Sequence, residues 1–351
     1  MNNFKLVATA DNHVGLFKNI SLLREDMLTD RIEEIGATFK QTVDDCVAEG
    51  IKYLFILGDM NHNRNIREDS INNYIKTLLL YAKEKGIIVY LLVGNHDQAN
   101  INGTVHAFEN MKDICNVIDK PCIIPISGFD CYFLPYEEYR GSIKSLELLL
   151  KQGKNSNRLL FAHVGIENAF LSGFDHVSKE PVTLGELQVD KFLGSYLGHY
   201  HLPQCLDEKN SVYYIGSPCQ HSLVDKPADR GYMIVELELV NGQWKTNNQR
   251  VTLDSPKFIE VEAKNYNPND YQGKNYIKVT GVTRKDIERL EKDENVYATT
   301  GERKEQVVDE DKVIQANLSW ELMVDKYVEI TCNKKRQHNR LKKLGKELIN
   351  V

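Results

Sequence analysis

The sequence predicts an α/β fold: a mixed β-sheet sandwich of the α+β kind, flanked by helices and followed by a small C-terminal α+β domain. Short runs of β-branched and aromatic residues alternate with helical patterns in the first half of the 351-residue chain, as in βαβ units. Strand patterns predominate in the second half, which a simple doubly wound sheet does not explain. Five strand patterns also end in Asp, His or Asn, and ligands of open α/β sheets bind beyond the carboxyl ends of the strands.

Three strands and two helices are predicted in the first half of the chain. Arg24–Gly50 carries apolar residues at helical spacing and stops at a glycine, and Asp69–Lys85 is closed by a glycine in the same way. Both segments are therefore expected to be helices. The predicted strands are Lys5–Thr9, Tyr53–Leu57 and Ile87–Val93.

The second half is richer in predicted strands. These are Ile123–Ile124, Asp130–Leu134, Leu159–Ala162, Tyr196–Leu197, Val212–Ile215 and Tyr232–Leu239. We place a domain boundary at Thr252–Pro256, which gives a main domain of residues 1–252, a small α+β domain of residues 253–332 and a basic segment of residues 333–351. The small domain has strand patterns near Phe258–Val261 and Tyr276–Val279, then a helix capped by Thr283.

The bulk composition is that of a globular protein, with 42% hydrophobic and 27% charged residues. A net charge of −6 argues against a generally cationic nucleic-acid binder. The longest apolar run, Ile87–Val93, is shorter than the about 20 residues that span a bilayer, so we expect no membrane span, and no secretory signal is visible. Seven cysteines without a CxxC pair predict reduced thiols and a cytoplasmic protein.

The last segment carries seven basic side chains against a single acidic one, Glu347. Three interpretations of this segment stay open. It is a solvated terminus, an amphipathic helix that docks on a partner through Leu341, Leu344 and Leu348, or a set of lysines that contacts phosphates directly.

Six of the ten histidines lie in the motifs at the ends of the strands. Taken singly, each polar residue there is as well explained by loop capping, but the ordered set is not expected by chance. Carboxylate and imidazole ligands together suit manganese, iron or zinc. Asp-x-His and His-x-His at a strand end put two side chains on one face. The motifs are Asp11-x-His13, Gly58-Asp59, Gly94-Asn95-His96-Asp97, His163 and Gly198-His199-x-His201.

In this order, the motifs resemble the calcineurin-like metallophosphoesterase superfamily over about residues 4–240. The resemblance implies two divalent cations, manganese first, with magnesium, iron or zinc as alternatives. His96 follows a ligand and is the natural general acid for the leaving oxygen, with Asp97 as its orienting partner. The implied ligands are Asp11, His13, Asp59 and His201 for one cation, and Asp59, Asn95, His163 and His199 for the other, so that Asp59 bridges the pair.

A narrower resemblance is to SbcD-like DNA-repair nuclease subunits. His62, three residues after Asp59, is similar to their phosphate-contacting histidine, and Tyr214–Pro218 is similar to their Gly-Ser-Pro stretch. The resemblance implies a manganese-dependent DNA exonuclease, with endonuclease activity as a second expectation. It also implies a DNA-capping second domain, a homodimer and an SbcC-like coiled-coil ATPase partner. The sequence has no P-loop, so ATP hydrolysis would come from another chain.

Two alternatives to a nuclease stay open. The first keeps the fold but acts on a small phosphodiester or a phosphomonoester, against which His62 and the extra C-terminal domain argue. The second is a binding module without activity, which would predict a damaged ligand set. Every ligand position is filled here by a competent residue.

Overall fold

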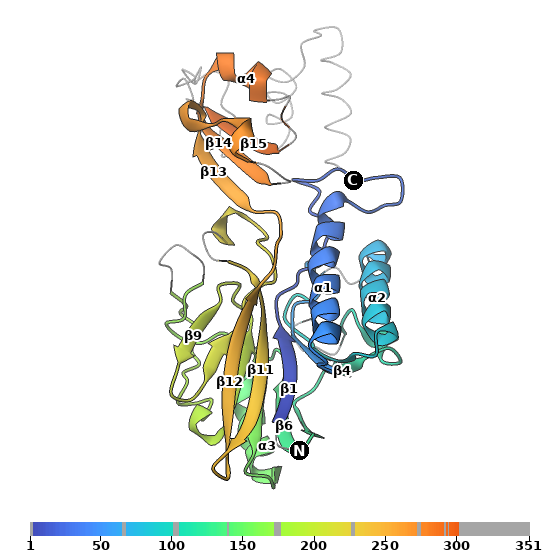
Figure 1. The fold of residues 1–351 in the computed structure, drawn as a ribbon, viewed down its shortest axis with the longest axis vertical. Helices are drawn as coiled ribbons and strands as arrows, with labels where there is room; N and C mark the ends of the chain where they lie inside the picture. Colours follow the sequence, from blue (N-terminus) through green and yellow to red (C-terminus); the bar gives the residue numbers. More distant parts are fainter. Residues whose placement is uncertain are drawn as a thin grey trace, which may run out of the picture.

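Two six-stranded β-sheets pack face to face and form the body of the molecule (Figure 1). This confirms the mixed-sheet sandwich flanked by helices that the sequence predicts. The computed structural model describes residues 3–64, 68–100, 105–138, 140–171, 177–225, 229–271, 275–290, 293 and 295–301.

The first sheet is parallel at its centre and antiparallel at one edge. The strands β1 to β4 run parallel, whereas β11 and β12 add to β1 as an antiparallel hairpin. The carboxyl ends of β1, β2 and β3 therefore lie at the same edge. In spatial order the strands are β12 (Gln243–Thr252), β11 (Gly231–Val240), β1 (Asn3–Thr9), β2 (Tyr53–Leu57), β3 (Ile88–Leu92) and β4 (Asn116–Ile118).

The second sheet has the same mixed character. Its four inner strands are parallel, and each edge strand pairs antiparallel to its neighbour. In spatial order they are β5 (Cys122–Ile126), β6 (Phe129–Leu134), β7 (Arg158–His163), β8 (Gly194–Gly198), β10 (Val212–Tyr214) and β9 (Gln204–Asp207).

Helices cover the outer faces of the two sheets. Helices α1 (Asp30–Ala48) and α2 (Asp69–Glu84) lie on the first sheet (Figure 1), and α3 (Gly141–Gln152) packs on the second. None of the described helices combines the length and apolar character that a bilayer crossing requires. The described residues also form five short 3₁₀ helices, at Glu109–Met111, Val189–Lys191, Leu223–Asp225, Ala263–Asn265 and Pro268–Asp270.

Aromatic side chains fill the layer between the two sheets. The Phe55 side chain of β2 is fully buried. Its ring centroid lies 4.7 Å from that of Phe161, 5.4 Å from that of Phe133 and 4.9 Å from that of Tyr90. These contacts join the two sheets, because Phe133 and Phe161 belong to the second one.

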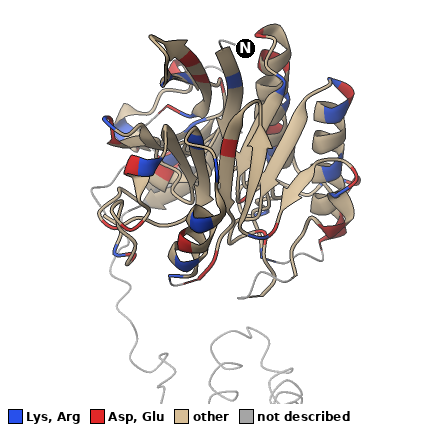
Figure 2. Ribbon diagram, turned by 90° about the horizontal axis from the view of Figure 1, so that it is seen from below, with Lys and Arg blue, Asp and Glu red and all other residues tan. Residues whose placement is uncertain are grey.

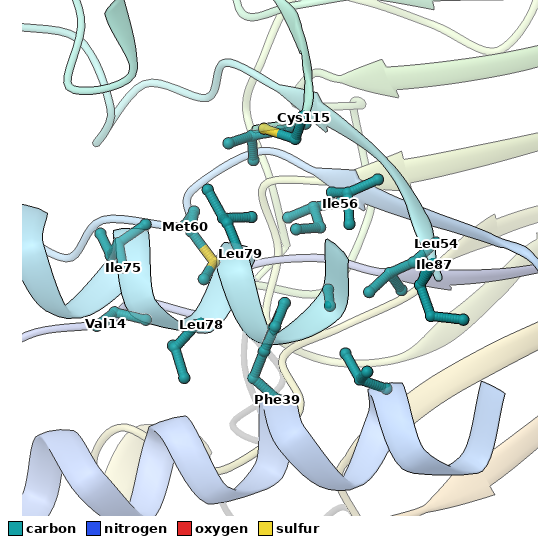
Figure 3. Close-up of a cluster of buried hydrophobic side chains, with 14 of the residues drawn as sticks. Val14, Phe39, Leu54, Ile56, Met60, Ile75, Leu78, Leu79, Ile87 and Cys115 are labelled. Atoms are coloured by element: carbon teal, nitrogen blue, oxygen red, sulfur yellow. The ribbon is translucent and has the colours of Figure 1, made fainter. Parts of the chain in front are cut away.

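A second apolar layer lies between the first sheet and its helices (Figure 3). Phe39 of α1 and Leu79 of α2 pack there with Leu54 and Ile56 of β2. Alternate residues of β2 thus face opposite layers, since Phe55 and Leu57 point into the layer between the sheets.

Helix α1 begins six residues later than the sequence predicts. Thr29 caps it: the Thr29 hydroxyl accepts from the Ile32 amide and donates to the Leu16 carbonyl at 2.7 Å. Residues 24–29 instead form a turn in which the Arg24 guanidinium binds Asp30 and Glu33. The apolar spacing correctly predicts a helix in this segment, but the cap at Thr29 determines that the helix begins at Asp30.

A third sheet lies beyond the sandwich, at one end of the molecule (Figure 1). It has an apolar core of its own, which includes Ile277 and Val279. The boundary drawn at Thr252–Pro256 remains a prediction, and residues 302–351, with the rest of the predicted capping domain and the basic segment, lie outside the described residues. The third sheet holds the parallel strands β13 (Phe258–Glu262), β14 (Tyr276–Val282) and β15 (Val296–Gly301), with helix α4 (Arg284–Leu290).

One buried cation joins this sheet to the sandwich. The Arg31 guanidinium of α1 lies 5.1 Å from the ring centroid of Tyr276 and 5.6 Å from that of Phe258. It also binds Glu34 at 3.0 Å and donates to the backbone carbonyl of Gln220. The Arg31 charge is thus held by a carboxylate, a carbonyl and two aromatic faces.

We expect Phe55→Ala to destabilise the chain by about 3–5 kcal/mol, because it removes a ring that joins both sheets and leaves a cavity. Unfolding in guanidinium chloride, followed by circular dichroism, measures this loss. The control is Leu148→Ala, at a side chain of α3 that is 59% exposed, which should change stability by less than about 0.5 kcal/mol. Equal stability of the two variants would contradict the assigned role of the Phe55 layer.

Candidate metal centre

The loops at the carboxyl ends of five parallel strands meet at one edge of the sandwich. Strands β1, β2 and β3 come from the first sheet, and β7 and β8 come from the second. The face-to-face packing brings these ends together, as expected from the sequence. The polar residues at these ends are Asp11 and His13 after β1, Asp59 after β2, Asn95 after β3, His163 at the end of β7, and His199 and His201 after β8.

Four of these seven residues have a left-handed backbone. The φ angles are 53° at Asp11, 48° at His13, 51° at Asp59 and 109° at His199. Non-glycine residues avoid this region, and such strain concentrates at functional sites. Loop-to-loop hydrogen bonds hold it in place: the Asp11 amide donates to the Gly58 carbonyl at 3.1 Å, and the His13 amide donates to the Asp59 carbonyl at 2.9 Å.

The first group of side chains consists of Asp11, His13 and His201. Their ligand atoms lie within 4.8 Å of one another. The Nε2 atoms of His13 and His201 face each other at 3.0 Å. Without an ion, a proton on one nitrogen bridges the pair, and a cation bound between the two rings would take the place of that proton.

The second group consists of Asn95, His163 and His199. The Asn95 side-chain oxygen lies 2.9 Å from His163 Nε2 and 3.0 Å from His199 Nδ1. Asp59 stands between the two groups: its Oδ2 atom is 3.4 Å from His163 Nε2 and 3.8 Å from His13 Nε2. The structure therefore brings all seven predicted ligands together, with Asp59 in the central position.

Hydrogen bonds on the outer side orient two of the imidazoles. His163 Nδ1 lies 2.7 Å from the Leu57 carbonyl, and His201 Nδ1 lies 3.0 Å from Asp225 Oδ1. Each Nδ1 therefore donates a proton outward, which directs Nε2 into the site. Burial opposes protonation of the His163 ring, but Asp59 and Asp11 outweigh it and raise the pKa of His163 to about 9. A cation that binds there must displace a proton from the ring, and the resulting set of carboxylate and amide oxygens and imidazole nitrogens fits two divalent cations. The role of each single ligand stays a prediction.

The electrostatics of the site also favour bound cations. Asp11 is completely buried, which raises the pKa of its carboxyl to about 6. Burial would raise the pKa of Asp59 too, but His163 and His96 together outweigh it and keep that pKa below its usual value. Burial, and then His201, lowers the pKa of His13 well below its ordinary value. Carboxylates out of contact with water need a compensating charge.

His96 lies beside the central carboxylate. Its backbone amide donates to Asp59 Oδ1 at 2.8 Å, and its ring centroid lies 4.7 Å from that of His13. The His96 Nδ1 atom contacts the His62 carbonyl at 2.6 Å and donates to it. The His96 Nε2 atom is then the one left for proton transfer.

His62 lies against the same site. Its ring stacks on Phe17 with centroids 4.2 Å apart and planes at 27°. Burial, and then the proximity of His96, lowers the pKa of His62 to about 4. The ring is therefore neutral near pH 7.

The prediction that Asp97 orients His96 is wrong. The Asp97 carboxylate instead accepts backbone amides: those of Asp59 at 2.9 Å, Asn61 at 2.8 Å and Gly94 at 2.8 Å. Three amide donors occupy it, and the His96 ring binds a carbonyl instead. Asp97 thus fixes the loop after β2 to the loop after β3, which positions the candidate ligands.

Three further residues of the site are not predicted by the sequence pattern. The His221 ring, which belongs to no strand-end motif, lies 3.0 Å from the Asp11 carbonyl through Nε2. Asp225 binds His201 and also accepts the His221 amide at 2.8 Å. Arg230 donates to the carbonyls of His201 and Asp225. None of the three follows a strand of the predicted set, so the strand-end pattern carried no signal for them.

The family model of the calcineurin-like phosphoesterases matches residues 4–225 of this chain. The chain therefore belongs to that family. Its members use a dinuclear metal centre and hydrolyse phosphoesters, and the residues described above are candidate ligands for such a centre.

Two relatives and one solved structure are similar to this chain. The chain is 25% identical over 288 residues to the D subunit of the SbcCD nuclease of Staphylococcus saprophyticus, over 75% of this chain and 72% of that protein. It is 26% identical over 274 residues to the "Uncharacterized metallophosphoesterase YhaO" of Bacillus subtilis, over 76% of this chain and 65% of that protein. Among solved structures, it resembles a dimetal phosphatase from Danio rerio with a TM-score of 0.45 and 12% identity, over 70% of this chain and 98% of the other.

We expect Asp225→Asn to weaken Mn²⁺ binding by about 10- to 100-fold, because the neutral amide no longer holds the His201 ring as firmly. Isothermal titration calorimetry with MnCl₂ measures this change. Asp207→Asn is the matched control. The Asp207 carboxylate, at the end of the edge strand β9, binds the nearby Asn210, so this variant should leave the affinity for Mn²⁺ unchanged. Equal Mn²⁺ affinities of Asp225→Asn and the parent chain would refute the role of Asp225.

Proposed function

We propose that this chain is a DNA nuclease that hydrolyses phosphodiester bonds with two divalent cations, as the nuclease subunit of an SbcCD-type complex. The observation that carries the proposal is the position of His96 and His62 beside a ligand set centred on Asp59. The similarity to a subunit of the SbcCD nuclease supports the choice of DNA as substrate. Exonuclease activity is the principal expectation and endonuclease activity the second.

In this proposal one cation is held by Asp11, His13, Asp59 and His201, and the other by Asp59, Asn95, His163 and His199. When bound, the two cations supply Lewis acidity toward the phosphate and activate the attacking water. Manganese is our first choice, because the set mixes imidazoles with hard oxygen ligands. Magnesium, iron and zinc are the alternatives.

The side chains around the ligands would donate the proton, bind the phosphate and position the loops. His96 donates a proton from Nε2 to the leaving oxygen, since its Nδ1 is held by the His62 carbonyl. The neutral His62 ring, braced by Phe17, donates a hydrogen bond to a phosphate oxygen. Asp97 acts only by holding the two loops in register.

The attraction for DNA is local in this proposal. The chain carries a net charge of −6, and in the view of Figure 2 basic and acidic residues are interspersed. The candidate ligands include just two carboxylates, Asp11 and Asp59, against the four charges of two divalent cations. A loaded centre is therefore positive and attracts a phosphate on a chain that is acidic overall.

The proposal includes partners. These are DNA, a second copy of this chain, and an SbcC-like coiled-coil ATPase that would supply ATP hydrolysis. Support comes from the similarity to a subunit of SbcCD. We also propose a cytoplasmic location, since the described cysteines are free thiols.

The nuclease reaction is tested with a linear duplex and with an aryl phosphate monoester, each with MnCl₂ and with EDTA. We expect Mn²⁺-dependent release of nucleotides and little monoester turnover. His96→Asn should lower kcat by about 10²- to 10⁴-fold with Mn²⁺ affinity retained, because the proton donor is lost and the ligands are not.

Lys151→Asn, at an exposed position of α3, is the control and should cleave like the parent chain. Full activity of His96→Asn would remove the general-acid assignment. Rapid monoester turnover with intact DNA would instead establish the small-substrate alternative.

The docking role of the basic segment is tested by deleting residues 334–351, which lie outside the described residues. We expect the truncated chain to lose co-purification with the ATPase, because the deletion removes an amphipathic pattern with seven basic side chains. Hydrolysis of a small aryl phosphodiester should survive. If the truncated chain co-purifies as the full chain does, the segment does not dock the ATPase.

A further inference from the structure

A pocket of about 470 Å³ opens beside the candidate metal centre. Asn95, whose side-chain oxygen belongs to the second ligand group, forms one wall. Tyr136 also lines the pocket, together with the polar side chains of Arg64, Asn100 and Glu138. A volume of this size lies within the range of small-ligand sites. A group held in the pocket would therefore be adjacent to a phosphate at the centre.

Tyr136 connects the pocket to the ligands. Its ring lies nearly parallel to that of His199, with centroids 5.9 Å apart and planes at 22°, and its centroid is 6.1 Å from that of His163. The backbone of Tyr136 is fixed on both sides: its amide donates to the Val93 carbonyl at 2.9 Å, and its carbonyl accepts from Gln98 Nε2 at 2.9 Å. These bonds fix the backbone of Tyr136 at the pocket, and its half-buried ring packs against His199 and His163.

The chemistry of the lining points to one class of ligand. An aromatic face offers stacking to any flat heterocycle, whereas the Asn100 amide and the Glu138 carboxylate offer hydrogen-bond partners for its edge. The exposed Arg64 adds a positive charge on the same pocket, which suits a phosphate. A flat base joined to phosphates satisfies all three features, and a purely apolar ligand satisfies only the first.

We propose that this pocket binds the nucleobase of a nucleotide that flanks the cleaved phosphate, with the base stacked on Tyr136 and the adjoining phosphate next to Arg64. The inference rests on the proposed function and extends it. A base in this pocket has left the stack of its own strand, so the centre selects unpaired nucleotides at ends or in single strands.

Binding of DNA without metal tests the pocket apart from catalysis. The probe is a fluorescein-labelled single-stranded trinucleotide in EDTA, followed by anisotropy, beside analogues that are abasic at each position in turn. We expect an abasic residue at one position to weaken binding to the parent chain by about 5- to 100-fold, which is the usual size of a base–aromatic stack.

The variants Tyr136→Leu and Tyr136→Phe separate stacking from other effects. Tyr136→Leu should bind the intact trinucleotide as weakly as the parent chain binds the abasic one, with no further loss on the abasic probe. Tyr136→Phe keeps the ring and should bind like the parent chain. Tyr81→Leu, on the outer helix α2, is the control and should leave binding unchanged.

Two results would overturn the inference. One is equal binding of intact and abasic trinucleotides by the parent chain. The other is a Tyr136→Leu variant that loses Mn²⁺ affinity in calorimetry but keeps the full penalty for the missing base, because the ring would then only support His199. Either result leaves Mn²⁺-dependent cleavage, and with it the proposed function, standing. A base-dependent binding site on a chain that cleaves no DNA would instead refute the proposed function alone.

Discussion

The Asp59 carboxylate is the point on which the rest of the site depends. Its Oδ1 atom accepts the His96 amide, and its Oδ2 atom lies between the imidazoles of His13 and His163. Its backbone is held as well: the amide binds Asp97, and the carbonyl accepts from His13. A single residue in a left-handed conformation therefore sets the spacing of both ligand groups and of the candidate proton donor.

Close approach of the loops makes this arrangement possible. A side chain at Gly58 would collide with the His163 ring, and one at Gly94 would collide with Asp59. Glycine at Gly58 also meets the need for a positive φ of 91°. The strained backbones of the candidate ligands are thus supported by tight packing between loops of both sheets, which no single loop could provide.

The sequence predicts most of the sandwich, because buried strands and amphipathic helices have clear periodicities. It does not reveal β12, whose residues are polar and partly exposed along an edge, or α3, which follows a loop without a capping residue. At the site, the seven candidate ligands could be located because each follows or ends a strand. Asp225 and Arg230 could not, since their contacts with His201 join residues 24 and 29 positions apart. The error on Asp97 has a similar cause: sequence proximity suggested His96 as its partner, whereas folding gives it the amides of three other residues.

The order in which the candidate ligands occur has a consequence for synthesis on the ribosome. Asp11, Asp59 and Asn95 emerge early, whereas His199 and His201 emerge only when more than half of the polypeptide has been made. Until then the nascent chain lacks one imidazole of each ligand group, that of His201 in the first and that of His199 in the second. A complete set of candidate ligands is thereby deferred until β8 has joined the second sheet, so an unfinished translation product has only part of the site.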